Sequence, residues 1–114
     1  FLSDKSADIY NQKTLRSMQG SHFHLPIYRG PILEMVETCK KQDLPVLATT
    51  LSEVSVDYKA VKTDGNFALV MGNEGQGISK EMAESANQLV HINMPGQAES
   101  LNVAVAAGIL MFSL

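Results

Sequence analysis

The sequence predicts an α/β fold in which a mostly parallel sheet is flanked by helices. Short apolar runs without a polar break have the pattern of strands that are covered on both faces. Segments with helical spacing separate these runs, and glycine or proline marks most of the junctions. The 114 residues suffice for one compact domain, 1–114, and are short for two. The predicted central strands are 44–49, 67–71 and 89–92.

The N-terminal segment is expected to form the end of a strand and then a helix. Phe1 and Leu2 have the character of a strand end, and a polar turn follows them. A helix is predicted over 12–19, with Asn11 as its N-cap. Gly20 stands where a helix commonly closes in a left-handed conformation.

A strand, helix, strand unit is predicted next. Residues 23–28 alternate roughly as a strand, and Pro26 indicates a sheet edge or a strand end. A helix over 31–42 begins with Pro31 in its first turn, and the strand 44–49 follows it. Such a unit places its two strands parallel in one sheet, with a right-handed crossover. The apolar face of this helix consists of Ile32, Leu33, Met35, Val36 and Cys39.

The second half of the chain contains a polar connection and two more helices. Residues 52–66 lack a clear period and are expected to be a connection with a strained turn at Asp64-Gly65. A short helix over 80–86 has Ser79 as its N-cap. The last helix begins near Leu101, with Ser100 as its cap, and runs to Phe112. Because it is apolar on nearly every side, we expect it to be enclosed.

The glycine-rich loop 72–77 directly follows a predicted strand. Glycines let the backbone take positive φ angles and approach a ligand closely, although a tight turn needs the same residues. Glu74 favours a ligand site, because open α/β sheets bind ligands at the carboxyl ends of their strands. The loop lacks both the lysine of a phosphate-binding loop and the glycine spacing of a dinucleotide site. Nucleoside triphosphate and nicotinamide functions are therefore disfavoured.

Two ordered motifs resemble those of a known family. Gly72 to Ser79 looks like the second signature of the SpoU/TrmH-type RNA ribose methyltransferases of the SPOUT superfamily. Ile92 to Gly96, continued by Ser100 to Ala104, looks like the third signature. A looser similarity over Ser3 to Pro26 extends the resemblance to nearly the whole chain.

The resemblance implies a specific chemistry and fold. Members of this family transfer a methyl group from S-adenosylmethionine to a ribose 2′-hydroxyl of rRNA or tRNA, and they act as homodimers. Their cofactor half contains a C-terminal trefoil knot to which both motif loops belong. By resemblance, Glu74, Ser100 and Asn102 lie near the methyl group as catalytic residues. The implied cofactor-binding residues are Thr49, Gly72, Asn73, Glu74, Gly75, Gly77, Ile92, Met94, Ser100, Leu101, Asn102 and Ala104.

Two features leave alternatives open. Thr49 follows a predicted strand, where it fits either the cofactor pocket or a simple sheet-edge turn. The family's first signature, with an asparagine and an arginine that helps to activate the hydroxyl, has no counterpart here. We therefore expect an N-terminally truncated chain that holds most of the cofactor pocket without catalytic competence by itself. The alternative function is a non-catalytic binding or dimerisation module, in which the last helix packs against a partner.

The charge balance is unusual for an RNA enzyme. The net charge is −3, with two arginines and seven lysines, whereas phosphate neutralisation normally supplies much of the affinity for RNA. Either an absent N-terminal portion contacts the RNA, which we expect, or the basic residues cluster on one face. Arg16 on the first helix is as compatible with a solvated charge as with a phosphate contact.

The remaining reactive residues favour a cytoplasmic protein without a metal. The single cysteine, Cys39, fits a helix core and cannot form an internal disulfide. His22 and His24 would share a face of an extended segment, but no third ligand stands at a recognisable spacing, so we expect no metal site. Ser21-His22 could equally contact RNA or make no functional contact. No signal peptide or membrane span is visible, and we expect no membrane partner.

Overall fold

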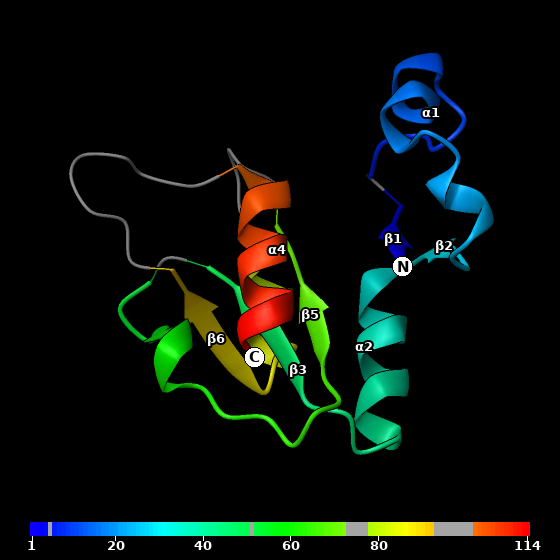
Figure 1. The fold of residues 1–114 in the computed structure, drawn as a ribbon. Helices are drawn as coiled ribbons and strands as arrows, with labels where there is room; N and C mark the ends of the chain where they lie inside the picture. Colours follow the sequence, from blue (N-terminus) through cyan, green and yellow to red (C-terminus); the bar gives the residue numbers. More distant parts are fainter. Residues whose placement is uncertain (5, 51, 73–77, 93–101) are drawn as a thin grey trace. The chain divides into compact units, whose positions relative to one another are not determined.

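The computed structural model describes residues 1–4, 6–50, 52–72, 78–92 and 102–114 of the chain (Figure 1). The chain forms two compact units, Phe1–Met35 and Val36–Leu114, and the boundary between them falls within helix α2 (Ile32–Lys41). The first unit contains a two-stranded sheet and the second a four-stranded sheet.

In the first unit two short strands pair with each other, and the helices of the unit lie between them in the sequence. Strand β1 (Leu2–Ser3) lies parallel to β2 (Arg29–Gly30). Between them lie α1 (Gln12–Met18) and a 3-10 helix, η1 (Ser21–Phe23). The predicted N-cap of α1 is confirmed, because the side chain of Asn11 accepts a hydrogen bond from Lys13 N at 2.9 Å. Gly20 has the predicted left-handed conformation (φ 85°), and Gln19 shares it (φ 48°).

Arg29 joins the two ends of the first unit. Its Nη1 donates to the carbonyl oxygens of Ser3 at 3.1 Å, Asp4 at 3.5 Å and Ser6 at 2.9 Å, and its Nη2 donates to that of Ala7. The planar guanidinium thereby supplies donors to several carbonyl groups of the exposed turn that follows β1.

Two predictions in this region are wrong. The strand expected over 23–28 is replaced by η1 and an irregular segment, and only Arg29–Gly30 pairs as a strand. Pro26 lacks the N–H that a ladder needs, which accounts for the interruption. His22 and His24 therefore do not lie on one extended strand. The predicted strand, helix, strand unit also fails, since β2 pairs with β1 whereas β3 (Val46–Thr49) pairs with β5 and β6.

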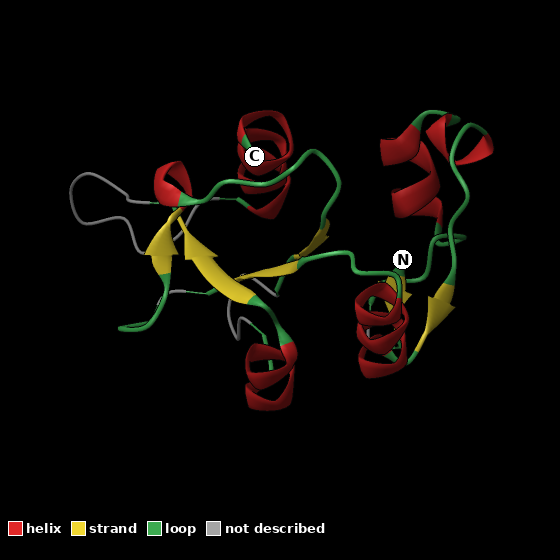
Figure 2. Cartoon of the chain, turned by 90° about the horizontal axis from the view of Figure 1, so that it is seen from below, coloured by secondary structure: helices red, strands yellow, loops and turns green. Residues whose placement is uncertain are grey.

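The second unit is the predicted parallel sheet flanked by helices. Its strand order is β4-β6-β3-β5, with every pair parallel. Helix α4 (Val103–Ser113) and the 3-10 helix η2 (Tyr58–Ala60) lie on one face of this sheet, and α3 (Lys80–Ser85) lies on the other (Figure 2). The remaining strands are β4 (Val56–Asp57), β5 (Ala68–Val70) and β6 (Gln88–His91).

The core of the second unit explains the apolar strands. Val46 and Ala48 of β3, Val90 of β6 and Leu110 of α4 have no exposed surface. Helices on both faces remove the need for a polar side, so these strands lack the alternation of a half-exposed sheet. Cys39 of α2 is also buried, at 6% exposure, as predicted.

Of the two helix starts predicted in this unit, that of α3 is confirmed and that of α4 lies later in the chain. Ser79 caps α3, accepting from Met82 N at 3.1 Å, as expected. Helix α4 instead begins at Val103 with Asn102 as its cap, two residues after the predicted Ser100. The polar connection 52–66 contains β4 and η2, which the irregular sequence pattern did not indicate, and its predicted turn is present, with Gly65 at φ 110°.

One side of α4 is exposed, so the expectation of full enclosure is wrong for the single chain. Leu110 is buried, whereas Val105, Met111 and Phe112 are 52%, 57% and 94% exposed. One sheet face can cover only one side of a helix that is apolar all round. Among the helices that the structure describes, none has the length and apolar character needed to cross a membrane.

Candidate functional site

Three parallel strands end together at one edge of the sheet of the second unit. The register pairs Ala48 of β3 with Val70 of β5, and Thr49 of β3 with Val90 of β6. The chain leaves this edge through Thr50 after β3, through Met71 and Gly72 after β5, and through Ile92 after β6. Figure 1 shows α4 beginning on the same side of the sheet. Carboxyl edges of parallel sheets are where α/β proteins bind ligands.

Hydrogen bonds fix this edge. The Thr49 hydroxyl donates to the carbonyl oxygen of Val70 at 3.3 Å, and Thr50 N donates to the carbonyl oxygen of Val90 at 3.1 Å. Thr49 therefore ties β3 to β5 directly below the start of the glycine loop. Because its proton is directed at Val70, the half-buried oxygen offers a ligand only its acceptor lone pairs.

Asn102 has a structural role besides the predicted catalytic one. Its Oδ1 accepts from Ala104 N at 2.9 Å and from Val105 N at 3.4 Å, which caps α4. The oxygen must face these N–H groups, so the two protons of Nδ2 point elsewhere. The exposed amide thus combines an occupied acceptor with donors that a ligand oxygen can use.

The structure places five of the predicted site residues. Thr49, Gly72 and Ile92 are half-buried at the strand ends, and Asn102, the cap of α4, and Ala104 in its first turn are exposed. These two groups lie on the same side of the sheet (Figure 1). The other predicted residues lie outside the described ranges: Asn73, Glu74, Gly75, Gly77, Met94, Ser100 and Leu101.

A contact between Ser55 and His91 was not anticipated. The Ser55 hydroxyl lies 2.8 Å from Nδ1 of His91, the last residue of β6, and donates to the carbonyl oxygen of Ser52 at 2.8 Å. Since the hydroxyl proton is directed at Ser52, Nδ1 of His91 donates to Ser55. This bond attaches the connection after β3 to the strand that precedes Ile92. The sequence offered one signal, a histidine in an otherwise apolar strand end.

Comparisons with known proteins identify the family. Residues 1–112 match the SpoU rRNA Methylase family. The chain is 42% identical over 113 residues to 23S rRNA (guanosine(2553)-2'-O)-methyltransferase RlmP of Bacillus subtilis. The aligned region covers 99% of this chain and 45% of that protein. It is 40% identical over 96 residues to tRNA (guanosine(18)-2'-O)-methyltransferase of Aquifex aeolicus, covering 82% of this chain and 45% of the relative.

A solved structure is similar throughout the chain. The AdoMet-bound rRNA methyltransferase from Sinorhizobium meliloti matches with a TM-score of 0.89 and 34% identity, over 98% of this chain and 43% of that one.

Parallel strands whose carboxyl ends meet at one edge, on the side where a capped helix begins, define an α/β protein of the class that binds ligands at this edge of the sheet. The chain belongs to the SpoU rRNA methylase family. The resemblance inferred from the two motifs is thereby confirmed. The chain spans less than half the length of the two relatives, 45% in each case.

Proposed function

We propose that the protein transfers a methyl group from S-adenosylmethionine to a ribose 2′-hydroxyl of rRNA or tRNA. The observation that supports this most directly is the meeting of Thr49, Gly72 and Ile92 at the carboxyl edge of the sheet, in a chain that matches the family over residues 1–112. The related proteins named above act on rRNA and tRNA.

The residues at this edge suit the nucleoside part of such a cofactor. Half-buried Ile92 offers an apolar surface, Gly72 has no side chain to keep a ligand from its backbone, and the Thr49 oxygen can accept a hydrogen bond. When bound, S-adenosylmethionine supplies an electrophilic methyl group on a sulfonium. Met94, Leu101 and the residues of the glycine loop complete the proposed cofactor site.

The chain's own groups would act on the incoming ribose. In the transfer, a bond would form between the 2′-oxygen and the methyl carbon while the bond from that carbon to sulfur breaks, its electron pair staying on sulfur. The hydroxyl proton would pass to a base, and among the proposed catalytic residues the Glu74 carboxylate is the group that can accept it. We place Glu74, Ser100 and Asn102 at this position, with the Nδ2 protons of Asn102 positioning a ribose oxygen. The capping bonds of Asn102 would hold these donors in a fixed direction.

The assembly that we propose is a homodimer formed through α4. The exposed side of α4 contains Val105, Met111 and Phe112, an apolar stripe of the kind that subunit interfaces bury. Gly108 lies on this side, and a Cβ built there meets no described atom within 4 Å. The missing side chain would let a second backbone approach. A C-terminal trefoil knot and a single methyltransferase domain over 1–114 belong to the same proposal.

The proposed compartment is the cytoplasm, where rRNA and tRNA are modified. The buried thiol of Cys39 takes part in no disulfide, which suits a reducing environment.

A second candidate function is a non-catalytic dimerisation module. The exposed apolar side of α4 favours it, because that surface needs a partner whether or not the sheet edge binds a cofactor.

Calorimetric titration with S-adenosylhomocysteine, the demethylated product, separates the two functions. We expect one site per chain, and Thr49→Val should weaken binding by about fivefold, since it removes one hydrogen bond worth about 1 kcal/mol. Thr63→Val, a half-buried threonine outside the site, is the matched control. A protein that dimerises normally but binds no S-adenosylhomocysteine would support the dimerisation module instead.

A further inference from the structure

The first unit contains a long segment without acidic residues. From Ile9 to Leu33 the sequence has Lys13, Arg16 and Arg29 but no aspartate or glutamate, giving a formal charge of +3. The whole chain has a net charge of −3, so the remaining residues together have −6. The basic residues are therefore segregated along the chain, despite its acidic balance.

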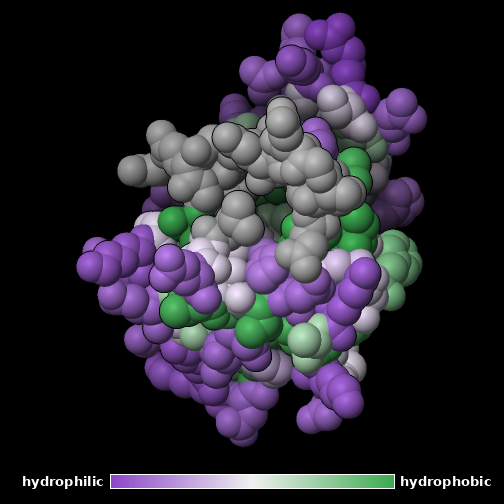
Figure 3. All heavy atoms as spheres, turned by 90° about the vertical axis from the view of Figure 1, so that its left-hand side faces the viewer, coloured by the Kyte–Doolittle hydropathy of each residue, from purple (hydrophilic) through white to green (hydrophobic). Residues whose placement is uncertain are grey.

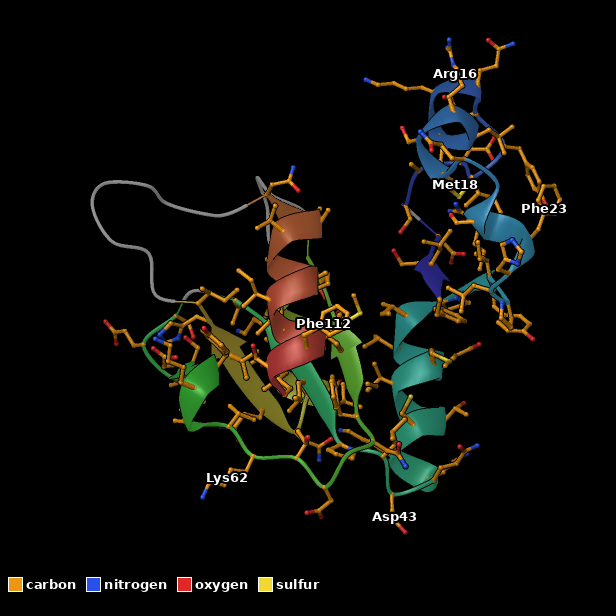
Figure 4. All side chains as sticks on the ribbon, viewed as in Figure 1. Arg16, Met18, Phe23, Asp43, Lys62 and Phe112 are labelled. Carbon is orange, nitrogen blue, oxygen red and sulfur yellow. The ribbon has the colours of Figure 1, made fainter. Side chains whose placement is uncertain are left out.

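The structure makes two of these cations available at a surface. Arg29 is bound to backbone carbonyls, whereas Lys13 and Arg16 are exposed on α1. Their spacing of three residues places them on one side of the helix. Arg16 extends away from the unit (Figure 4), with its Nε donating to the carbonyl oxygen of Gln12 at 3.3 Å. At the top of Figure 3, where α1 lies in Figure 1, the surface is strongly hydrophilic.

Exposed aromatic rings lie in the same acid-free segment. Tyr10 precedes the cap of α1, Phe23 ends η1 and Tyr28 precedes β2, and they are 72%, 81% and 67% exposed. The ring of Phe23 extends outward from the unit (Figure 4). Leu25, at 67% exposure, lies between the last two rings in the sequence.

We propose that this surface docks a single-stranded segment of RNA. We call it the α1–η1 surface and define it by Tyr10, Lys13, Arg16, Phe23, Leu25 and Tyr28. Cations that neutralise phosphates, combined with rings on which bases stack, are the two elements of single-strand recognition. A duplex keeps its bases stacked inside, so exposed rings gain nothing from it. A protein partner does not account for the absence of carboxylates over 25 residues.

The proposal rests on the proposed function in one respect, that the substrate is RNA. It bears on the problem raised by the acidic composition, since Lys13 and Arg16 are exposed cations in a segment without carboxylates, which Asp8, an acceptor from Tyr10 N at 2.9 Å, borders on its N-terminal side. The candidate cofactor residues lie in the second unit, so the two sites can be tested separately.

The test measures binding of a fluorescein-labelled, mixed-sequence RNA of about 16 nucleotides, as a single strand and as a duplex, to the full-length protein. The variant Lys13→Gln/Arg16→Gln should weaken single-strand binding about tenfold and reduce the slope of log K against log salt by about 1.4, corresponding to two phosphate contacts. The matched control is Lys40→Gln/Lys41→Gln, two exposed lysines in the last turn of α2, which should change neither quantity.

A second variant tests the stacking component. Phe23→Leu keeps an apolar side chain but removes the ring, and it should weaken single-strand binding by at least about fivefold without changing the salt slope. Because Phe23 is 81% exposed, its replacement leaves the fold intact.

Four results would overturn the proposal. The first two are an equal loss of affinity for Lys13→Gln/Arg16→Gln and for Lys40→Gln/Lys41→Gln, and an equal loss for duplex and single strand. The others are a change of oligomeric state in place of a change in RNA affinity, and an unaltered protein that binds no single-stranded RNA. S-Adenosylhomocysteine binding, measured on the same preparations, then distinguishes the two proposals. If the protein fails the RNA test but binds S-adenosylhomocysteine normally, only the proposed RNA surface is wrong. If the unaltered protein does not bind S-adenosylhomocysteine either, the proposed function fails too.

Discussion

At the scale of single residues, Arg29 stabilises the first unit through its geometry rather than through its charge. One planar guanidinium reaches the carbonyl oxygens of Ser3, Asp4, Ser6 and Ala7. Arg29→Lys keeps the charge but cannot span this turn, so we expect it to lower the free energy of unfolding by about 1 to 2 kcal/mol. Thermal unfolding measures this loss of stability. The Ser6 amide donates to Ser3 O at 3.0 Å, so faster hydrogen exchange at Ser6 would show that the loss arises in this turn.

Arg16→Lys is the control for this substitution. Arg16 makes one exposed hydrogen bond to its own helix, at 3.3 Å, so the same chemical change there should stay within about 0.5 kcal/mol of the unaltered protein. Equal effects at Arg16 and Arg29 would show that the carbonyl contacts contribute nothing.

Asn102 combines a cap with a proposed catalytic donor, and two substitutions separate these roles. Asn102→Asp keeps an oxygen for Ala104 N but loses the amide protons, so stability should be kept while methyl transfer by the full-length protein falls about a hundredfold. Asn102→Ala should lose both, with a stability cost of about 1 kcal/mol. Unfolding curves and transfer of labelled methyl groups to RNA measure the two effects.

Asn66→Asp, the same change in an exposed connection, should affect neither quantity. If Asn102→Asp methylates RNA at the normal rate, Asn102 is a cap only.

At the scale of elements, the cap of α3 has an effect that can be isolated. Ser79 accepts from Met82 N at 3.1 Å, and the side chain of Met82 is 2% exposed. Ser79→Ala should therefore cost about 1 kcal/mol of unfolding free energy, measured by denaturant titration. Ser17→Ala is the comparison, because the Ser17 hydroxyl donates at 2.9 Å to Lys13 O on an exposed helix face, and its loss should be small. A Ser79→Ala protein as stable as Ser17→Ala would show that the cap is not needed.

Elements with a strong local signal were predictable from the sequence. Asn11, Ser79 and Gly20 mark helix ends through chemistry that acts within three residues, and all three predictions are confirmed. The 23–28 strand was wrong because alternation alone does not supply a neighbouring strand with matching hydrogen bonds. Strand β4 was missed because two residues make no pattern, and it is defined by the pairing of Val56 with Val90 and of Asp57 with His91.

At the scale of the whole molecule, the sequence indicated the edge where the candidate site forms. Apolar strands imply a parallel sheet, and parallel strands bring Thr49, Gly72 and Ile92 to one edge from positions far apart in the chain. The Ser55 contact to His91 was not predictable, since it depends on how the 52–66 connection folds. The acid-free segment was visible in the sequence, but its meaning depended on which cations the structure leaves exposed.

The same substitution should have different effects on the exposed side of α4 and on the α1–η1 surface. Phe112 and Phe23 are 94% and 81% exposed, so replacing either with serine should leave the isolated chain stable. If α4 packs against a second copy, Phe112→Ser removes a buried ring from the interface, worth about 1.5 to 3 kcal/mol, and raises the dimer dissociation constant by at least about tenfold. Phe23→Ser should weaken RNA binding and leave the dimer unchanged.

Sedimentation equilibrium over a range of concentrations distinguishes these outcomes. A dimer that persists unchanged with Phe112→Ser, or a monomer in the unaltered protein at high concentration, would contradict an interface on α4. The exposed apolar side of α4 must still be covered. A dimer that persists with Phe112→Ser would therefore mean that another segment of the full-length protein packs there. Dissociation caused by Phe112→Ser alone would instead show that the helix mediates assembly and that its all-round apolar sequence reflects two packing surfaces, the sheet and the second copy.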